Sequence, residues 1–368
     1  MARIAPKIKT DSFRKDTVMR RILRLGNLPA TAWSIAIAAG MVLGLGGWTP
    51  RAVARGPGTG DLDLLQLRPN FYVIGGAGGN IVMQVGPVGV ILVDSGAAQM
   101  SDKVLATIRR VTPLPIRYII NTGMDADHVG ANDTLAKAGL SILAGAIAAG
   151  AGLSDDLVTN SGGASVLAHE NVLTRMSAPT GRQSLFPLAL WPTKTFTART
   201  YAMYLNGEGI QVMHEPGAHT DGDSIVFFRR GDVIATGDIV DTTRFPVIDV
   251  EKGGSVQGEI DALNHLMDLS IPNLPLQWNP DRTFLVPGHG RVLDKIDLLE
   301  YRDMVTVVRD RIQDLLSEGK TLDQVKAANP TLSYRRRYGS DSGPWTTDKF
   351  VEVIYKELAA KKSARTAK

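Results

Sequence analysis

The sequence contains no cysteine in its 368 residues. This absence excludes a disulfide framework, a zinc site built from thiolates and a cysteine nucleophile. Any transition-metal site in the chain must therefore use histidine, aspartate and glutamate side chains. Because the chain has only six histidines, each of them can be weighed individually as a ligand.

An excess of basic residues is also absent beyond the N-terminal segment. Residues 1–55 hold ten Lys and Arg and two Asp, a net charge of +8, whereas residues 56–368 hold 31 basic and 35 acidic residues, a net charge of −4. The net positive charge of the whole chain therefore comes from the N-terminal segment, and the rest of the chain shows no sign of a nucleic-acid-binding surface. With 44% hydrophobic and 21% charged residues, the composition is typical of a globular protein.

The N-terminal segment follows the order of a secretory signal. Residues 3–24 are rich in Arg and Lys, residues 32–48 form an uncharged run, and an Ala-x-Ala cleavage motif occupies residues 52–54. We therefore predict a leader over residues 1–55, a mature chain that begins near Arg55, and a periplasmic or secreted protein with no stable membrane insertion after cleavage. Since the uncharged run of 17 residues approaches the minimum length of a membrane span, an uncleaved anchor is the alternative.

Beyond a Gly- and Pro-rich linker, short apolar runs alternate with glycine turns, a pattern typical of strands. The first group of predicted strands lies at residues 70–76, 80–86, 89–96, 116–122 and 140–144, with helices at 101–112 and 131–139. The second group has strands at residues 209–217, 224–238 and 283–290 and a helix near 255–269. Ser101 is expected to cap its helix and Gly139 to end the next one. Strands in two groups, each with helices, predict an α/β protein in which two sheets pack face to face under outer helices.

A C-terminal helical extension is predicted over residues 301–368. The helical pattern starts near Asp297 and places Leu298, Tyr301 and Val305 on one apolar stripe. About 70 residues form little core of their own, so we expect these helices to pack on the sandwich. No fixed-period repeat occurs in the sequence.

Polar residues recur just beyond the predicted strands. Since strand ends are rigid and the loops that leave them converge on one rim, functional side chains tend to gather there. Each residue alone is more simply explained as a turn former or as a polar group with a hydrogen-bond partner. Several such residues at the same position after a strand indicate a functional site. The residues in these positions are Asp94, Asp125, Asp127, His128, His219, Asp238 and His289.

These residues resemble the ordered motifs of the metallo-β-lactamase superfamily over roughly residues 61–300. The family has an Asp after an early strand, a His-x-His-x-Asp-His loop, and then a His, an Asp and a His. The phrases "ILVDSG", "GAHTDGDS", "ATGD" and "VPGHG" are close to the usual form of four of these motifs, in the correct order. The resemblance implies an αββα sandwich with a C-terminal helical extension and a hydrolytic site for one or two metal ions at one edge.

The sequence departs from the family in the His-x-His-x-Asp-His loop. Gly123 and Asp125 stand where the family has its two leading histidines, whereas the last two positions are unchanged. Carried over position by position, the resemblance implies a first metal group of Asp125, His219 and Asp238. It implies a second group of Asp127, His128 and His289 that shares Asp238, while Asp94 orders the loop.

The resemblance implies zinc as the metal, as one or two ions. Fewer imidazoles and more carboxylates make the first group harder, which favours manganese or iron there. A glycine run at residues 75–79 lacks the Lys-Ser/Thr ending of a phosphate-binding loop and is interpreted instead as a turn that overhangs the site.

The predicted function is that of a metal-dependent hydrolase. Metal ions would activate a water molecule, and Asp127 would orient or deprotonate it. The water would attack a small-molecule ester, lactone, β-lactam or related bond. Two alternatives remain open at this stage: an iron redox enzyme on the same scaffold, and a catalytically impaired protein that binds metal or ligand. No pattern in the sequence indicates an oligomeric state.

Overall fold

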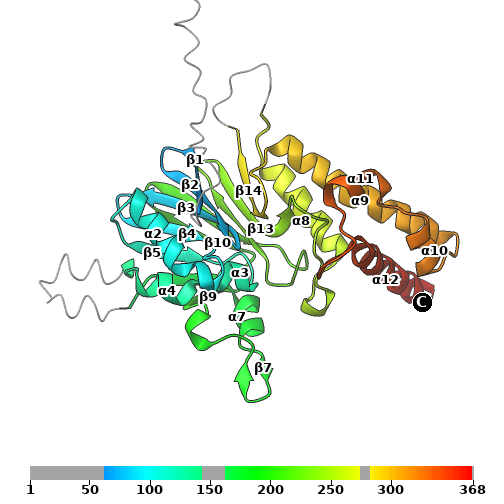
Figure 1. The fold of residues 1–368 in the computed structure, drawn as a ribbon, viewed down its shortest axis with the longest axis horizontal. Helices are drawn as coiled ribbons and strands as arrows, with labels where there is room; N and C mark the ends of the chain where they lie inside the picture. Colours follow the sequence, from blue (N-terminus) through cyan, green and yellow to red (C-terminus); the bar gives the residue numbers. More distant parts are fainter. Residues whose placement is uncertain (1–61, 143–161, 274–281, 367–368) are drawn as a thin grey trace, which may run out of the picture. The chain divides into compact units, whose positions relative to one another are not determined.

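Two β-sheets carry the fold in the computed structural model, which describes residues 62–142, 162–273 and 282–366 (Figure 1). The predicted leader therefore lies outside the described residues. The first sheet has the strand order β1-β2-β3-β4-β5-β6-β9 and the second the order β10-β11-β12-β13-β14. None of the helices in the described ranges is long and apolar enough to cross a membrane.

The first sheet combines an antiparallel meander with parallel strands. Strands β1 to β4 pair antiparallel, and β4, β5, β6 and β9 pair parallel. All five residues of β4 are buried, as expected for a central strand that is covered on both faces. The strand bounds are Asp63–Arg68 (β1), Phe71–Ala77 (β2), Gly79–Gly86 (β3), Gly89–Val93 (β4), Ile116–Ile120 (β5), Ser165–His169 (β6) and Lys194–Phe196 (β9).

The second sheet is antiparallel except at its last pair. Strands β10 to β13 form successive antiparallel pairs, and β14 joins β13 in parallel. The bounds are Thr200–Leu205 (β10), Glu208–His214 (β11), Ser224–Phe228 (β12), Val233–Asp241 (β13) and Phe284–His289 (β14). A separate two-stranded ribbon consists of β7 (Pro179–Thr180) and β8 (Gln183–Ser184).

The predicted αββα sandwich is confirmed by the way successive strand residues divide between two cores. Ile91 and Ile120 belong to the core between the two sheets, whereas their neighbours Leu92 and Ile119 belong to the core under the outer helices. This division follows from the alternation of side chains along a strand. Helices α2 (Ser101–Val111) and α4 (Asn132–Lys137) cover the first sheet, and α8 (Val256–Leu269) covers the second (Figure 1).

The C-terminal helices share one hydrophobic core with α8 and the second sheet. Tyr301 and Phe350 are fully buried in this core, and the ring of Phe350 stacks on that of Phe245 at 4.8 Å between centroids. The helices are α9 (Lys295–Ser317), α10 (Leu322–Ala327), α11 (Leu332–Tyr338) and α12 (Thr347–Thr366).

Several local predictions are wrong. The N-cap of α2 is Met100, not Ser101, because a 3-10 turn, η1 (Ala98–Met100), runs directly into the helix. Residues 140–142 form no strand, and the remainder of the predicted strand at 140–144 lies outside the described residues. Strands β1, β6, β9 and β10, helix α11 and a short helix, α3 (Ala126–Val129), were not predicted. A further helix, α7 (Glu170–Met176), follows β6.

Candidate metal centre

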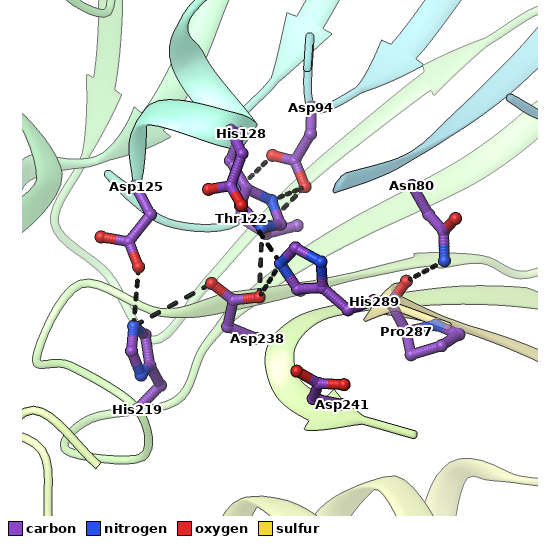
Figure 2. A network of polar contacts seen from close by, with 12 residues as sticks. Asn80, Asp94, Thr122, Asp125, His128, His219, Asp238, Asp241, Pro287 and His289 are labelled. Carbon is purple, nitrogen blue, oxygen red and sulfur yellow. Dashed lines mark hydrogen bonds and ion pairs between the residues drawn. The ribbon is translucent and has the colours of Figure 1, made fainter. Parts of the chain in front are cut away.

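The predicted ligands lie together where parallel strands of both sheets end. Asp94 follows β4, the loop after β5 leads into α3, and Asp238 and His289 belong to β13 and β14. His219 comes from the turn between β11 and β12. Figure 2 shows side chains from these separate segments converging on one cluster.

Asp94 holds the loop after β5 in place, as predicted. Its Oδ1 accepts a hydrogen bond from the Thr122 amide at 2.8 Å, and its Oδ2 accepts from the Thr122 hydroxyl at 2.7 Å. The same Oδ2 lies 2.8 Å from Nδ1 of His128. Asp94 is buried and has a left-handed φ of 64°, a conformation that Asp and Asn adopt more readily than other non-glycine residues.

The second group consists of Asp127, His128 and His289. One potential ligand atom from each residue lies within 4.8 Å of the others. With Nδ1 of His128 donating to Asp94, Nε2 of that ring faces the group, and its lone pair would bind a metal ion once this nitrogen is deprotonated. Nε2 of His289 lies 3.3 Å from Oδ2 of Asp127.

The first group consists of Asp125, His219 and Asp238, again with ligand atoms within 4.8 Å of one another. The backbone carbonyl of Val247 lies 2.7 Å from Nδ1 of His219 and fixes that nitrogen as the donor. Nε2 of His219 then faces Oδ2 of Asp125 at 2.9 Å. Asp125 therefore occupies the position where the sequence analysis placed a replacement ligand.

Asp238 lies between the two groups (Figure 2). Its Oδ1 lies 3.1 Å from Nε2 of His128 and 3.4 Å from Nε2 of His289, and its Oδ2 lies 4.0 Å from Nε2 of His219. The register between β13 and β14 is irregular on both sides of Gly237, the residue that precedes Asp238. Gly237 has a φ of 54°, and a Cβ there would lie 2.6 Å from the Thr122 hydroxyl, so only glycine fits the position.

The hairpin between β2 and β3 lies against α3, as the glycine run predicted. A Cβ on Gly79 would lie 3.3 Å from the carbonyl oxygen of Asp127 and 3.4 Å from Cε1 of His128. The close approach of the hairpin restricts the movement of the short helix that carries both ligands.

The imidazoles and carboxylates of the two groups shift one another's pKa values. Burial lowers the pKa of His219, but Asp125, Asp223 and Asp238 outweigh burial and raise the pKa to about 10. Burial likewise opposes ionisation of Asp238, yet His128 and the other histidines hold its pKa below the usual range. In the protein alone, protons on the imidazoles thus compensate the carboxylates.

The donor set fits divalent metal ions in both positions. The imidazoles of His128 and His219 are held by partners on Nδ1, and carboxylates complete each group. A metal ion would replace the compensating protons, because metal ligands must be deprotonated. The second group offers two imidazoles and the first group one, so the second is better suited to zinc.

A cavity of about 130 Å³ opens at the cluster. Three of its lining residues, Asp241, Arg244 and Val247, were not among the predicted site residues. Lys252, outside the lining, was not predicted either, and its Nζ lies 3.9 Å from Oδ1 of Asp125. The only signal in the sequence was their position in the segment that follows Asp238, which carries no recognisable motif.

The other three histidines have structural roles. His169 caps α7 through its Nδ1 and stacks on His214 at 3.6 Å between ring centroids. Nδ1 of His265 lies 2.6 Å from Oε1 of the buried Glu215. None of the three lines the cavity at the metal ligands.

Comparison with known proteins identifies a family model, described as the metallo-beta-lactamase superfamily, that matches residues 74–289. A search of curated proteins gives no significant match. Among solved structures, the stereoselective inverting sec-alkylsulfatase Pisa1 from Pseudomonas sp. has 15% identity and a TM-score of 0.53, with 80% of this chain and 50% of that one covered. A metallo-beta-lactamase from Pontibacter korlensis has 13% identity and a TM-score of 0.47, with 67% and 99% covered. The chain thus spans half the length of the alkylsulfatase that it matches.

Proposed function

The chain belongs to the metallo-β-lactamase superfamily, and on that premise we propose that it is a metal-dependent hydrolase of a small molecule. The observation that carries the proposal is the arrangement of six potential ligands in two groups around Asp238. Within that arrangement, His128 and His219 each present Nε2 to the cluster because Nδ1 has a fixed partner.

Bound metal ions would lower the pKa of a water molecule and polarise the bond under attack. The residues of this chain would then hold the metal, position the water and limit what enters. Asp127 is suited to orient or deprotonate the water, because its side chain is 37% exposed and lines the cavity, whereas His128 is fully buried. Asp127 is therefore the proposed catalytic residue.

The size of the cavity limits what can be bound there. Pockets that enclose a whole drug-sized ligand usually measure about 300–1,000 Å³, so a cavity of about 130 Å³ takes only the reacting group and its neighbours. The rest of the substrate would extend out of the cavity. This fits cleavage of an ester, lactone, β-lactam or related bond at the edge of a small molecule.

Zinc is the proposed metal for the second group, because this group has one imidazole more than the first group. The first group combines one imidazole with two carboxylates, so manganese or iron is the alternative there. We also propose that the segment before Arg55 directs export and is removed, which N-terminal sequencing of the protein from its native host tests.

Elemental analysis and hydrolysis assays on natively purified protein test the proposed function together. We expect one or two ions of a divalent metal per chain, loss of hydrolysis of an ester, lactone and β-lactam panel on chelation, and recovery on adding zinc. His289→Ala should lose metal and activity, whereas His265→Gln, outside the cluster, should retain both. Iron with optical bands and no hydrolysis would indicate the redox alternative, and absence of metal would indicate a binding protein.

A further inference from the structure

Arg244 is a cationic side chain in the cavity that holds the proposed metal ligands. It follows β13 and is one of the eight described residues that line the cavity, four of which carry carboxylates. No other arginine or lysine is among those eight residues. The side chain is 40% exposed, so it is reachable from solvent.

The guanidinium of Arg244 is held from one side by Asp241. Nε of Arg244 lies 2.8 Å from Oδ2 of Asp241. Oδ1 of the same carboxylate accepts hydrogen bonds from the amide and the hydroxyl of Thr243, at 2.7 and 2.6 Å. Asp241 is buried, so the carboxylate that faces the guanidinium is fixed by the protein interior.

The two terminal nitrogens of Arg244 form no hydrogen bond with any described residue, and the shortest contact of this side chain with a carboxylate is through Nε. Arg291, on the loop after His289, differs in that both terminal nitrogens contact Asp297. A guanidinium fork with its terminal nitrogens free matches the geometry of two oxygens of a carboxylate, sulfate or phosphate. Arg244 is thus pre-positioned to bind an oxyanion beside the metal ligands.

We infer that Arg244 is a specificity-determining residue that binds an oxyanionic group of the substrate, so that the substrate of the proposed hydrolase is an anionic small molecule. This inference rests on the proposed function. The small cavity places the oxyanion close to the bond that is cleaved. Asp241 acts as a positioning residue, because it orients the guanidinium without reaching the substrate.

Calorimetric binding of acetate, sulfate and phosphate to the zinc-loaded protein tests the inference. Because oxyanions also bind metal ions directly, the informative quantity is the change in Kd between wild type and Arg244→Met. Loss of a charge-assisted, two-point contact should raise the Kd of the preferred anion about 10- to 100-fold. The anion with the largest change identifies the group as a carboxylate, a sulfate or a phosphate.

Two further variants serve as comparisons. Arg291→Met removes an arginine of similar location whose fork is already occupied, and its Kd values should equal those of wild type. Asp241→Asn should weaken binding less than Arg244→Met does, because the guanidinium remains but is less well oriented.

The result that overturns the inference is a Kd within about twofold of wild type in Arg244→Met for all three anions, or no binding of any anion by wild type. Zinc content, measured on the same samples, should be unchanged in Arg244→Met, since Arg244 is not a ligand. A protein that binds zinc and hydrolyses esters but shows no Arg244-dependent binding refutes the inference alone. A protein that binds no zinc refutes the proposed function, and the anion titration then decides on Arg244 separately.

Discussion

Replacement of Asp94 by asparagine should reduce metal affinity without unfolding the protein. The substitution preserves shape, and the left-handed φ of 64° at this residue is one that asparagine also adopts. The amide oxygen can continue to accept from the Thr122 amide, while the NH₂ group takes the place of Oδ2. There it meets the Thr122 hydroxyl, which can rotate to accept, and Nδ1 of His128.

The expected loss of metal affinity follows from the contact between residue 94 and His128. An NH₂ group can only donate, so Nδ1 of His128 must become the acceptor and the ring proton moves to Nε2. Nε2 is the atom that faces Asp238 at 3.1 Å, and a protonated Nε2 cannot bind metal. Loss of such a supporting partner typically costs about 10- to 100-fold in metal affinity, which corresponds to roughly 1.4–2.7 kcal/mol.

Zinc affinity should be measured by competition with a chromogenic chelator. Asp133→Asn is the matched control, because Asp133 forms an exposed ion pair with Lys137 at 2.8 Å. Wild-type zinc affinity in Asp94→Asn would refute the reasoning. Asp94→Ala is less informative, since alanine in the left-handed region adds a backbone cost of about 1–2 kcal/mol.

Three further predictions concern the first group, a buried carboxyl and the C-terminal helices. Asp125→Ala should remove one of two bound ions. Gly123→His has room for the new side chain, because the nearest atom to a Cβ there is Oδ1 of Asp223 at 3.8 Å. This variant should shift the metal preference of the first group from manganese toward zinc in elemental analysis. Burial raises the pKa of Glu259, which has no hydrogen-bond partner among the described residues, well above 4.5. Wild type should therefore lose stability relative to Glu259→Gln as the pH rises above 4.5, because only the unfolded chain ionises there; thermal unfolding of both proteins at pH 5 and pH 8 measures this. Phe350→Ala should lower the free energy of unfolding in urea by about 3–5 kcal/mol.

Each of these predictions has a contradicting result. Wild-type metal content and activity in Asp125→Ala would make Asp125 an ordinary loop residue. A stability difference between wild type and Glu259→Gln that does not change between the two pH values would mean that Glu259 is ionised in the folded state. A loss below about 1 kcal/mol in Phe350→Ala would be that of a typical surface site and would show that the C-terminal helices do not stabilise the core.

The architecture and the cluster of ligands could be predicted because each motif residue directly follows a short apolar run. Asp94 and His128 come from parallel neighbours, β4 and β5, whose carboxyl ends necessarily meet at one edge. Strand β10 was missed because its residues Tyr201–Leu205 are nearly all apolar although alternate positions are exposed, so hydrophobic alternation is absent. The N-cap of α2 was misplaced because the preceding turn already supplies helical geometry at Met100.

The parts of the site that could not be predicted depend on backbone atoms and on loop geometry. The partner of Nδ1 in His219 is the carbonyl of Val247, and every residue type has a carbonyl. Arg244 is placed in the cavity by its contact with Asp241, yet two polar residues three positions apart in a loop are common. Such contacts become visible only when the loop conformation is known.

The shared position of Asp238 has a consequence for how the proposed metal ions would bind. Because one carboxylate serves both groups, occupation of one group alters the charge and orientation available to the other. Thermodynamic linkage then requires the effect to be reciprocal: whatever factor the first ion imposes on the affinity of the second, the second imposes on the first. At limiting metal, strong positive coupling would give a mixture of empty and fully occupied molecules, whereas strong negative coupling would give molecules that hold a single ion.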